Sequence, residues 1–470
     1  MDLVQRMGGP PPRAANHAPP VLARQVVVDA RENPAWMAAY AKLRHREFVA
    51  EQRLFSGHDV DDWDRDPQTI ILTALGPDGA VLGGVRLHPE NADIGWWRGS
   101  RLVTAGGGGW ARRTVGEALV RAACARAMEA GALRFDAYVQ LGHEMFFTRL
   151  GWSAIRRAEQ GGRDHRLMRW PIERLAEQAQ ATKGLLGELI GGMLPADRWL
   201  GDDGVPLAGS EIVACVDAIT PSMVDRDPEW AGWCGMLVTA GDLAAMGASP
   251  LGVLDAVGGR DAAHVASVLS GVRAGSDAFG LPVLGGHTQL GVPGALSVSG
   301  FGRTDHPVPG GGGRPGDALW VCTDIEGGWR PGYYGRQWDS TSWRRRDELR
   351  AMLGLVACSR PRAAKDASMA GIVGTISMLT EASGCGAELE LERIPRPAGA
   401  QLADWLSCFP GFAMVMAQPA EAPAPTGNAA VSASCGTLCA ESGVRLRWPD
   451  GEVTTAIDSS SITGLGAAAR

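Results

Sequence analysis

The sequence predicts two folded parts of different class, an α+β domain over residues 21–170 and a larger α/β module over 199–470. In the first part, short β-branched runs alternate with segments of helical spacing. An Ala-, Gln- and Gly-rich stretch at 171–198 then predicts a helical linker. The glycine run Gly310–Gly313 predicts a hinge inside the second part. The two lobes on either side of this hinge would span 199–310 and 311–470.

The composition is that of a globular protein, with 45% hydrophobic and 21% charged residues. No apolar run approaches the roughly 18 residues that a membrane helix needs, so we expect no membrane partner. Residues 1–20 lack the apolar stretch of a signal peptide and predict a disordered tail. The nine cysteines include no CxxC pair, which is typical of reduced thiols in a cytoplasm.

The net charge of −7 is unevenly distributed. Residues 1–170 carry 23 basic against 19 acidic side chains, whereas 171–470 carry 22 against 33. Neither part has the basic stripe of a nucleic-acid surface. The difference suits a polyanionic ligand in the first part and a carboxylate metal site in the second.

The first part contains a regular series of predicted elements. The turn residues Gly76-Pro-Asp-Gly79 predict a hairpin, and Gly131 predicts the end of a helix. In chain order we expect a strand at 26–28, a helix at 34–49, hairpin strands at 70–75 and 81–87, a strand at 100–104, a helix at 114–130 and a strand at 134–139.

A phosphate-binding site is predicted where the 114–130 helix begins. The segment Arg113-Thr-Val-Gly116-Glu-Ala118 follows the glycine-rich loop Gly106–Gly109. A helix N-terminus presents unpaired N–H groups and the positive end of the helix dipole. Small side chains at 116 and 118 allow close approach, and Arg112 adds positive charge.

This block resembles the acyl-CoA-binding motif R/Q-x-x-G-x-G/A of GNAT acyltransferases. The later segment Phe146-Phe-Thr-Arg-Leu-Gly-Trp152 is similar to the signature that closes many GNAT domains. The resemblance covers roughly 36–155 and implies a GNAT fold that uses acetyl-CoA or another acyl-CoA. It implies cofactor contacts from Arg112, Arg113, Thr114, Val115, Gly116, Glu117 and Ala118.

One position departs from the GNAT pattern. Phe147 stands where these enzymes often carry the Tyr that protonates the leaving thiolate, and Phe has no proton to donate. Either Tyr138, His143 or Glu144 takes this catalytic role, or the domain binds acyl-CoA without fast transfer.

The segment from Leu43 to Asp64 is rich in acidic and imidazole side chains. Residues 58–64 could line a pocket for an amine substrate and supply a base, or could form a solvated acidic loop. The segment also resembles the N-terminal signature of acyl-homoserine-lactone synthases, which share the GNAT fold.

Carboxylates recur in the second part in settings where a lone charge is costly. Asp202 and Asp203 stand in a Gly-Asp-Asp-Gly sequence, Asp217 interrupts an apolar strand, and Asp242 lies within a predicted helix. A buried carboxylate needs a partner or a cation. Because Mg²⁺ in nucleotide sites is held by carboxylates and phosphate oxygens, these residues predict a magnesium site.

The order of these pieces, followed by Gly285-Gly-His-Thr288 and Lys365-Asp-Ala-Ser368, resembles the AIR-synthase/thiamine-monophosphate-kinase/selenophosphate-synthetase superfamily. The resemblance implies a two-lobed PurM-like fold whose N-terminal lobe forms a dimeric β-barrel, with strands 212–219 and 295–301 as candidates, and an α/β C-terminal lobe. It implies Mg²⁺ ligands at Asp202, Asp203, Asp217 and Asp242, ATP contacts at Gly286, His287, Thr288, Asp366 and Ser368, and a catalytic Lys365.

Two absences in the sequence narrow the chemistry. No GxxxxGK[ST] motif occurs, which excludes a P-loop ATPase. Selenophosphate synthetases carry a reactive Cys before the first Asp pair, whereas residues 187–200 contain none. The expected reaction is therefore γ-phosphoryl transfer to an oxygen, as the final step or to activate a carbonyl.

The combination resembles the GNAT and AIR-synthase-like fusion proteins of bacterial nitrilase gene clusters, on the segments Gly328-Trp-Arg-Pro331 and Cys408-Phe-Pro-Gly-Phe412. It implies a bifunctional enzyme of nitrogen metabolism, with small-molecule substrates and partners from the same cluster. The alternative is a sensor or scaffold that binds acyl-CoA and nucleotide without turnover.

Overall fold

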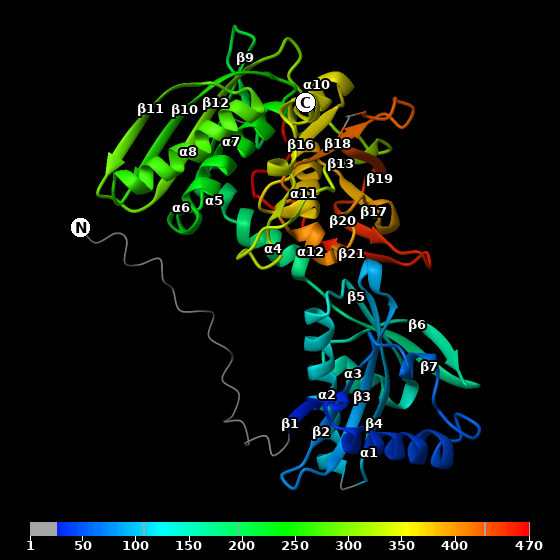
Figure 1. Cartoon of the computed structure of the whole chain (residues 1–470). Coiled ribbons are helices and arrows are strands. Elements are labelled where there is room, and N and C mark those ends of the chain that lie inside the picture. Colours follow the sequence, from blue (N-terminus) through cyan, green and yellow to red (C-terminus); the bar gives the residue numbers. More distant parts are fainter. Residues whose placement is uncertain (1–25, 107–108, 196, 427–428, 470) are drawn as a thin grey trace. The chain divides into compact units, whose positions relative to one another are not determined.

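The computed structural model divides the chain into two compact units, Met1–Ile172 (unit 1) and Glu173–Arg470 (unit 2). Figure 1 draws both, and each is described by itself. The predicted tail 1–20 lies outside the described residues. The structure describes residues 26–106, 109–195, 197–426 and 429–469.

Unit 1 contains a seven-stranded sheet in the order β1-β2-β3-β4-β5-β7-β6. The predicted hairpin is confirmed, because β2 and β3 pair antiparallel. The predicted first helix is shorter than 34–49 and continues as a π-helical turn at His45–Glu51. The elements are β1 Val26–Asp29, α1 Pro34–Arg44, β2 Ile70–Leu75, β3 Val81–Asn91, β4 Trp96–Thr104, α2 Gly109–Glu129, β5 Arg134–Gln140, α3 Glu144–Arg149, β6 Ser153–Gln160 and β7 Arg163–Trp170.

Alternating side chains of the sheet form separate cores on its two faces. Ile71 packs with Tyr40 of α1, whereas its neighbour Leu72 packs with Val115 and Leu119 of α2. Successive strand residues point to opposite faces, so one apolar strand supplies both cores. Helices therefore cover both faces of the sheet.

Strands β4 and β5 form a parallel pair that opens along its length. They pair only from Trp96 with Arg134 to Gly99 with Ala137. Beyond Gly99, β4 contains a bulge against β3, and Arg101 in it has a φ of 54°. A bulge leaves an extra residue unpaired and bends its strand. The second half of β4 consequently leaves β5, and space opens between them.

Helix α2 begins earlier than predicted. It starts at Gly109 instead of residue 114, so the backbone N–H groups of Thr114–Ala118 lie inside the helix. The expectation that these groups are free to bind phosphate is therefore wrong. Gly107 and Gly108 of the predicted loop lie outside the described residues.

Unit 2 begins with the segment predicted to be a linker. This segment is helical, but α4 buries Leu175 and Ala179 and packs on α11 and α12, so it belongs to unit 2. The elements are α4 Arg174–Lys183, α5 Leu186–Ile190, β8 Val205–Pro206, β9 Ile212–Ile219, α6 Pro221–Arg226, α7 Pro228–Ala245, β10 Ser249–Gly259, α8 Ala262–Phe279, β11 Val283–Leu290, β12 Ala295–Arg303, β13 Ala318–Thr323, β14 Gly328–Trp329, β15 Trp338–Asp339, α9 Arg346–Leu353, α10 Leu355–Ser359, β16 Ala363–Asp366, α11 Gly371–Ser383, β17 Gly386–Glu390, α12 Leu402–Ser407, β18 Ala413–Gln418, β19 Val431–Cys439, β20 Gly443–Arg447 and β21 Val453–Ile457.

The first sheet of unit 2 is open, with the strand order β11-β10-β12-β9-β8. Helices α7 and α8 cover one face; α8 starts at the Asp261 N-cap and ends at Gly280 in the left-handed conformation. On the other face Val216 and Leu254 are 65% and 42% exposed, and both lie in register with Ser299 between them. In the single chain these strands form an open sheet with an exposed apolar face.

The second sheet of unit 2 has seven strands in the order β16-β18-β13-β19-β17-β20-β21. Helix α11 packs against it, with α4 and α12 on α11. Strand β17 lies inside this sheet, between β19 and β20.

The run Gly310–Gly313 is closely packed, which contradicts the predicted hinge. A Cβ at Gly310 would lie 2.7 Å from Asp202 Oδ1, and one at Gly312 would lie 2.0 Å from the Arg362 carbonyl oxygen. Glycine is required here by close approach of neighbouring groups. Segments of both lobes meet at this run.

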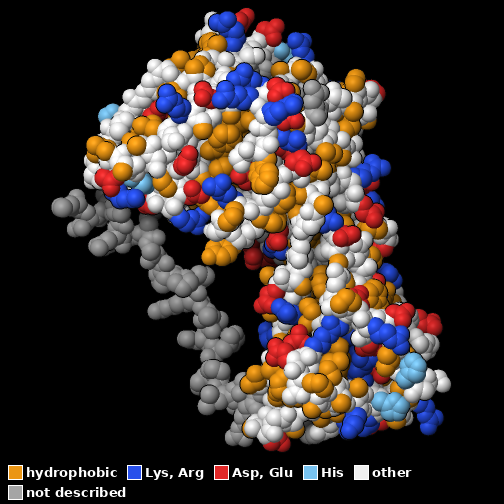
Figure 2. Space-filling model, in the orientation of Figure 1, with side chains coloured by type: hydrophobic (Ala, Val, Ile, Leu, Met, Phe, Trp, Pro, Cys, Tyr) orange, Lys and Arg blue, Asp and Glu red, His pale blue; other side chains and the backbone are white. Residues whose placement is uncertain are grey.

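Within the described ranges, every helix is too short or too polar to cross a bilayer. Figure 2 shows acidic and basic side chains interspersed over the visible face of each unit.

Candidate functional site

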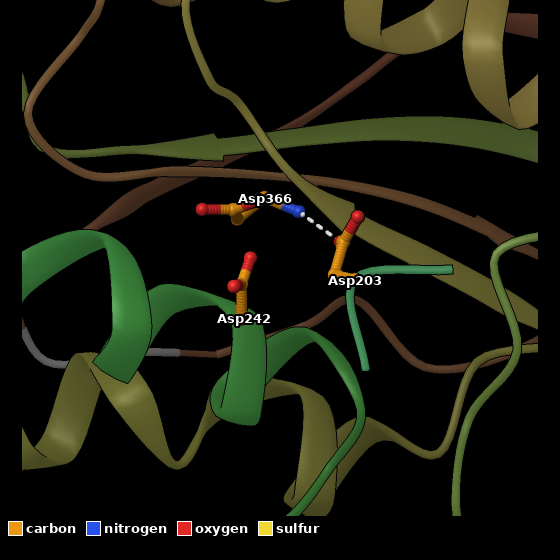
Figure 3. A group of neighbouring side chains, drawn as sticks. All are labelled: Asp203, Asp242 and Asp366. Atoms are coloured by element: carbon orange, nitrogen blue, oxygen red, sulfur yellow. Dashed lines mark hydrogen bonds between the residues drawn. The ribbon is translucent and has the colours of Figure 1, made fainter. Parts of the chain in front are cut away.

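Three carboxylates from distant parts of unit 2 converge. Asp203 lies in the turn before β8, Asp242 near the end of α7 and Asp366 at the end of β16. One carboxylate oxygen of each lies within 4.8 Å of the others. Figure 3 shows Asp242 pointing from its helix toward the other two. A Cβ at Gly241 would lie 2.7 Å from Asp366 Oδ2, so the glycine before Asp242 makes room for this approach.

Lys365 is the buried cation of this group. Its Nζ donates to Asp203 Oδ1 at 2.7 Å and to the Gly201 carbonyl oxygen at 2.8 Å. The backbone N–H of Asp366 donates to Asp203 Oδ2 at 3.0 Å (Figure 3). Burial would lower the pKa of Lys365, but Asp203 and Asp202 outweigh it and raise this pKa. Lys365 is therefore an ammonium that holds Asp203.

The remaining carboxylates have too little positive charge around them. Burial, followed by repulsion from neighbouring carboxylates, raises the pKa of Asp242 and Asp366 well above the usual range. Asp202 accepts from the Gly310 N–H at 2.8 Å, but its Oδ2 is buried without a partner, and burial raises its pKa to about 7. Burial also raises the pKa of Asp217.

These residues fit a divalent cation. Asp203, Asp242 and Asp366 bring their oxygens together, with Asp202 beside Lys365 and Asp217 beside Asp242. Two lysines, Lys365 and Lys183, act on this group. Oxygen ligands from separate elements are what Mg²⁺ takes in nucleotide sites. A bound cation would relieve the repulsion that raises these pKa values. Of the predicted residues, Asp203 and Asp242 meet directly, and Asp366, expected to contact nucleotide, takes a place in the metal cluster.

The predicted ATP contacts on β11 lie elsewhere in the chain's fold. β11 is the edge strand, and β10 and β12 separate it from β9 with Asp217. Three strand spacings amount to about 14 Å. Gly286, His287 and Thr288 are exposed there, and His287 faces away from the helices, opposite Ala256. A single chain therefore does not bring them onto the aspartates.

Ser368, expected to contact ATP, lies just before helix α11 and does not cap it. The N-cap of α11 is Ala370, and Ser368 instead contributes its carbonyl oxygen to the Gly371 N–H. Gly371 has a φ of 72°, so the chain turns there before the helix begins.

A second candidate site is a cavity of about 800 Å³ in unit 1, between the separated halves of β4 and β5. Its walls include Leu102 and Thr104 of β4 and Val139 of β5. The volume is typical of a cavity for a cofactor-sized ligand. Of the residues predicted for acyl-CoA or catalysis, those that line the cavity are Arg112, Arg113, Gly116, Tyr138 and His143.

The other predicted residues of unit 1 serve different contacts. Val115 belongs to the core, and Glu117 accepts from Arg121 at 2.9 Å on the helix surface. Glu144 pairs with Arg166 at 3.2 Å. These three, with Thr114 and Ala118, are outside the cavity lining.

The acidic segment 58–64 is solvated only in part: Asp62 is exposed, whereas the other three aspartates form ion pairs. Asp59 and Asp64 bind Arg44, and Asp61 binds Arg86 and Arg101. Burial alone would raise the pKa of Asp64, but hydrogen bonds from Arg44 and the Asp61 backbone hold it well below its usual range. Asp59, Asp61 and Asp64 therefore form ion pairs with arginines, and Asp61 also lines the cavity.

Sequence reasoning missed a polar group on β3 and β4. His88, Arg98 and Ser100 line the cavity, and Glu90 binds His88. The sequence does contain a signal for this group: Arg86, His88 and Glu90 stand at every second position of an otherwise apolar, buried strand. Their grouping with Ser100 depends on the pairing of β3 with β4.

Two family models match the chain. One describes the N-terminal domain of AIR synthase related protein and matches residues 201–304. The other describes the C-terminal domain and matches residues 341–446. Both fall within unit 2, on either side of the glycine run.

Relatives of known sequence agree with these models. An uncharacterized protein of Synechocystis is 33% identical over 225 residues, which cover 46% of this chain and 69% of that protein. An uncharacterized protein of Methanocaldococcus jannaschii is 32% identical over a match that covers 40% of this chain and 60% of that protein. The thiamine-monophosphate kinase of Methanospirillum hungatei is 30% identical over a match that covers 36% of this chain and 60% of that protein.

Solved structures resemble the chain at lower similarity. Thermotoga maritima PurL complexed with ATP has a TM-score of 0.49 at 16% identity, over 63% of this chain and 52% of that one. A thiamine monophosphate kinase of Aquifex aeolicus has a TM-score of 0.43 at 19% identity, over 54% and 92%.

Proposed function

Because the chain belongs to the AIR synthase related protein family, we propose that unit 2 is a Mg·ATP-dependent enzyme that transfers the γ-phosphoryl group to an oxygen of a small molecule. The observation that carries this proposal is the convergence of Asp203, Asp242 and Asp366. Phosphoryl transfer depends on positioning and on charge stabilisation by metal and cations. Related thiamine-monophosphate kinases support a kinase reaction.

The residues of unit 2 have separable roles in this proposal. Asp203, Asp242 and Asp366 would hold Mg²⁺, which, when bound, neutralises phosphate charge. Lys365 fixes the orientation of Asp203 and adds positive charge. Activation of a carbonyl for attack by nitrogen is the second candidate reaction, since it begins with the same transfer.

The proposal is tested by incubating the full chain with Mg·ATP and a panel of small alcohols, phosphate esters and amides. We expect ADP release that requires one panel member and Mg²⁺. The Asp203→Asn variant should abolish it, whereas Asp305→Asn, at an exposed position, should not. ADP release that persists in Asp203→Asn would contradict the assignment.

We propose that unit 2 forms a homodimer through the open sheet. Exposed apolar side chains lie on β9, β10 and β11, among them Val216, Leu254 and Leu284. An exposed apolar sheet is a liability that association removes. Light scattering should show a dimer for the wild type and a monomer for Leu254→Asp, and a monomeric wild type would contradict it.

For unit 1 we propose acyl-CoA binding and acyl transfer to an amine. The supporting observation is the cavity between β4 and β5, with Arg112, Arg113 and Gly116 on its wall. Two guanidinium groups at a cavity mouth suit a pyrophosphate. Calorimetry with CoA tests this: Gly116→Val should weaken binding because its side chain would enter the cavity, and unchanged affinity would contradict the site.

The two activities together would make a bifunctional enzyme, which we place in the cytoplasm and in nitrogen metabolism linked to nitrilase-type gene clusters. A metabolite screen with ATP and acetyl-CoA together would identify consumed substrates. Phe147, buried on the cavity wall, favours the alternative of an acyl-CoA sensor without turnover. Acyl-homoserine-lactone synthesis is a further reaction for the same cavity.

A further inference from the structure

A serine, a histidine and a glutamate form a chain of hydrogen bonds at the wall of the unit 1 cavity. Ser100 Oγ lies 3.4 Å from His88 Nδ1, and His88 Nε2 lies 3.1 Å from Glu90 Oε1. With the proton on Nε2, His88 donates to Glu90 and its Nδ1 can accept from Ser100. A nucleophile, a base and a group that orients the base occur here in sequence, which is the arrangement of activated serines.

The surroundings hold these groups in place. His88 stacks on Trp63 with ring centroids 4.7 Å apart, and its side chain is only 3% exposed. Arg98 pairs with Glu90 at 2.8 Å. Burial would raise the pKa of Glu90, but the His88 hydrogen bond and the Arg98 charge outweigh it and lower this pKa. Burial lowers the pKa of His88, which keeps the ring neutral and able to accept a proton.

Ser100 occupies the point where the cavity opens. It is the first residue of β4 beyond the last pair with β5, Gly99 with Ala137, and it is partly exposed on the cavity wall. Arg86 Nε donates to Ser100 Oγ at 3.0 Å. The same guanidinium pairs with Asp61 and Asp64, so Arg86 is held in place and fixes the position of the Ser100 hydroxyl.

We propose that Ser100 is the nucleophile of unit 1 and that acyl transfer proceeds through an acyl-enzyme ester on its Oγ. This inference rests on the proposed acyl-CoA function. Ser100 Oγ attacks the thioester carbonyl, and its proton moves to His88 Nδ1. The carbon–sulfur bond breaks, and the sulfur of CoA leaves with the proton from His88. An amine then attacks the ester, and its proton returns through His88 to Ser100 Oγ as the amide forms.

This route also accounts for Phe147. The phenyl ring lines the same cavity and has no proton for the leaving thiolate. The imidazolium formed on His88 supplies that proton, so a tyrosine at 147 is not required. His88 then serves as base in one half-reaction step and as acid in the next.

The test uses the full chain and acetyl-CoA without an acceptor, because the first half-reaction needs none. Intact-mass and peptide analysis should show one acetyl group on the peptide that contains Ser100, with release of one CoA per chain. Ser100→Ala should lack the label, and its release of CoA should fall by about a hundredfold or more. Ser153→Ala, on β6 outside the cavity lining, should behave as the wild type.

A second variant covers the case in which Ser100→Ala folds poorly. Ser100→Cys keeps a nucleophile and should carry the acetyl group as a thioester. If CoA binds the chain but neither the wild type nor Ser100→Cys becomes acetylated, the inference is overturned and acyl-CoA binding stands. Release of CoA from acetyl-CoA at an unchanged rate in a folded Ser100→Ala would also overturn it. If CoA does not bind at all, the proposed function of unit 1 fails.

Discussion

Both units bury clusters of aspartates, but their charges are balanced differently. In unit 1, Asp59, Asp61 and Asp64 face three arginines at ion-pair distance. In unit 2, five aspartates have two lysines nearby: Lys365 acts on Asp202, Asp203 and Asp366, and Lys183 acts on Asp217 and Asp366. Arginine partners lower the pKa of Asp64 and Asp61, whereas burial and mutual repulsion raise those of Asp242 and Asp366.

The difference separates a structural cluster from a binding site. Paired carboxylates in unit 1 join the segment 58–64 to α1 and the sheet, and removal of one partner leaves a buried charge. The carboxylates of unit 2 repel one another, and the proposed cation would relieve this repulsion. A cluster of acidic residues therefore does not by itself indicate a metal site. The number of basic side chains close enough to pair with the carboxylates distinguishes the two kinds of cluster.

The largest expected effect is the loss of one partner in unit 1. Asp64→Asn removes a charge that faces Arg44 and Arg86, and we expect unit 1 to lose about 3–5 kcal/mol of stability. Hydrogen exchange of the full chain, read for each unit, measures this. Asp62→Asn is the matched control because Asp62 is fully exposed, with only Arg65 as a partner. Equal effects of the two changes would break the comparison.

The opposite sign is expected for Asp242→Asn in unit 2. Loss of one charge reduces repulsion, so the metal-free protein should melt a few degrees higher. Affinity for Mg·ATP should fall roughly a hundredfold, about 3 kcal/mol. Calorimetry and thermal melts measure both, with Asp305→Asn as control. A lower melting temperature with intact Mg·ATP affinity would make Asp242 a structural residue like Asp64.

Mg²⁺ itself should distinguish the units. At a hundred times its Kd, a ligand that binds only the folded state stabilises it by about 2.7 kcal/mol. We expect Mg²⁺ to slow hydrogen exchange in unit 2 around Asp203 and Asp366, and chelation to reverse this, while unit 1 stays unchanged. Protection confined to unit 1 would refute the assignment.

The smallest expected effect is a loss of stability of unit 1 at low pH. The folded pKa of Asp64 lies below its unfolded value of about 4, so its contribution to stability is complete above pH 4 and is lost as pH falls through the folded pKa. Unit 1 of the wild type should therefore lose stability below pH 4. The same titration of Asp64→Asn should be flatter, and an equal slope would assign the acid sensitivity to other groups.

Sequence alone determined much of the local structure. The hairpin of β2 and β3, the bounds of β9 and the two lobes with their family models follow from turn residues, apolar patterns and motif order. The sequence predicts Asp203 from the Gly-Asp-Asp-Gly motif, and Asp242 because a charge inside an apolar helix is costly. These are properties of short segments, where spacing determines which side chains share a face.

Only the tertiary structure decided which side chains meet. Asp366 joins Asp203 and Asp242, 163 and 124 positions earlier in the chain, because β16 and α7 are packed together. Ser100 reaches His88 because β3 and β4 pair with Arg86 opposite Ser100 and His88 opposite Arg98. The glycines at 310–313, expected to be flexible, are fixed by their neighbours. Long-range packing sets the charge around a carboxylate, and that charge separates an ion pair from a ligand.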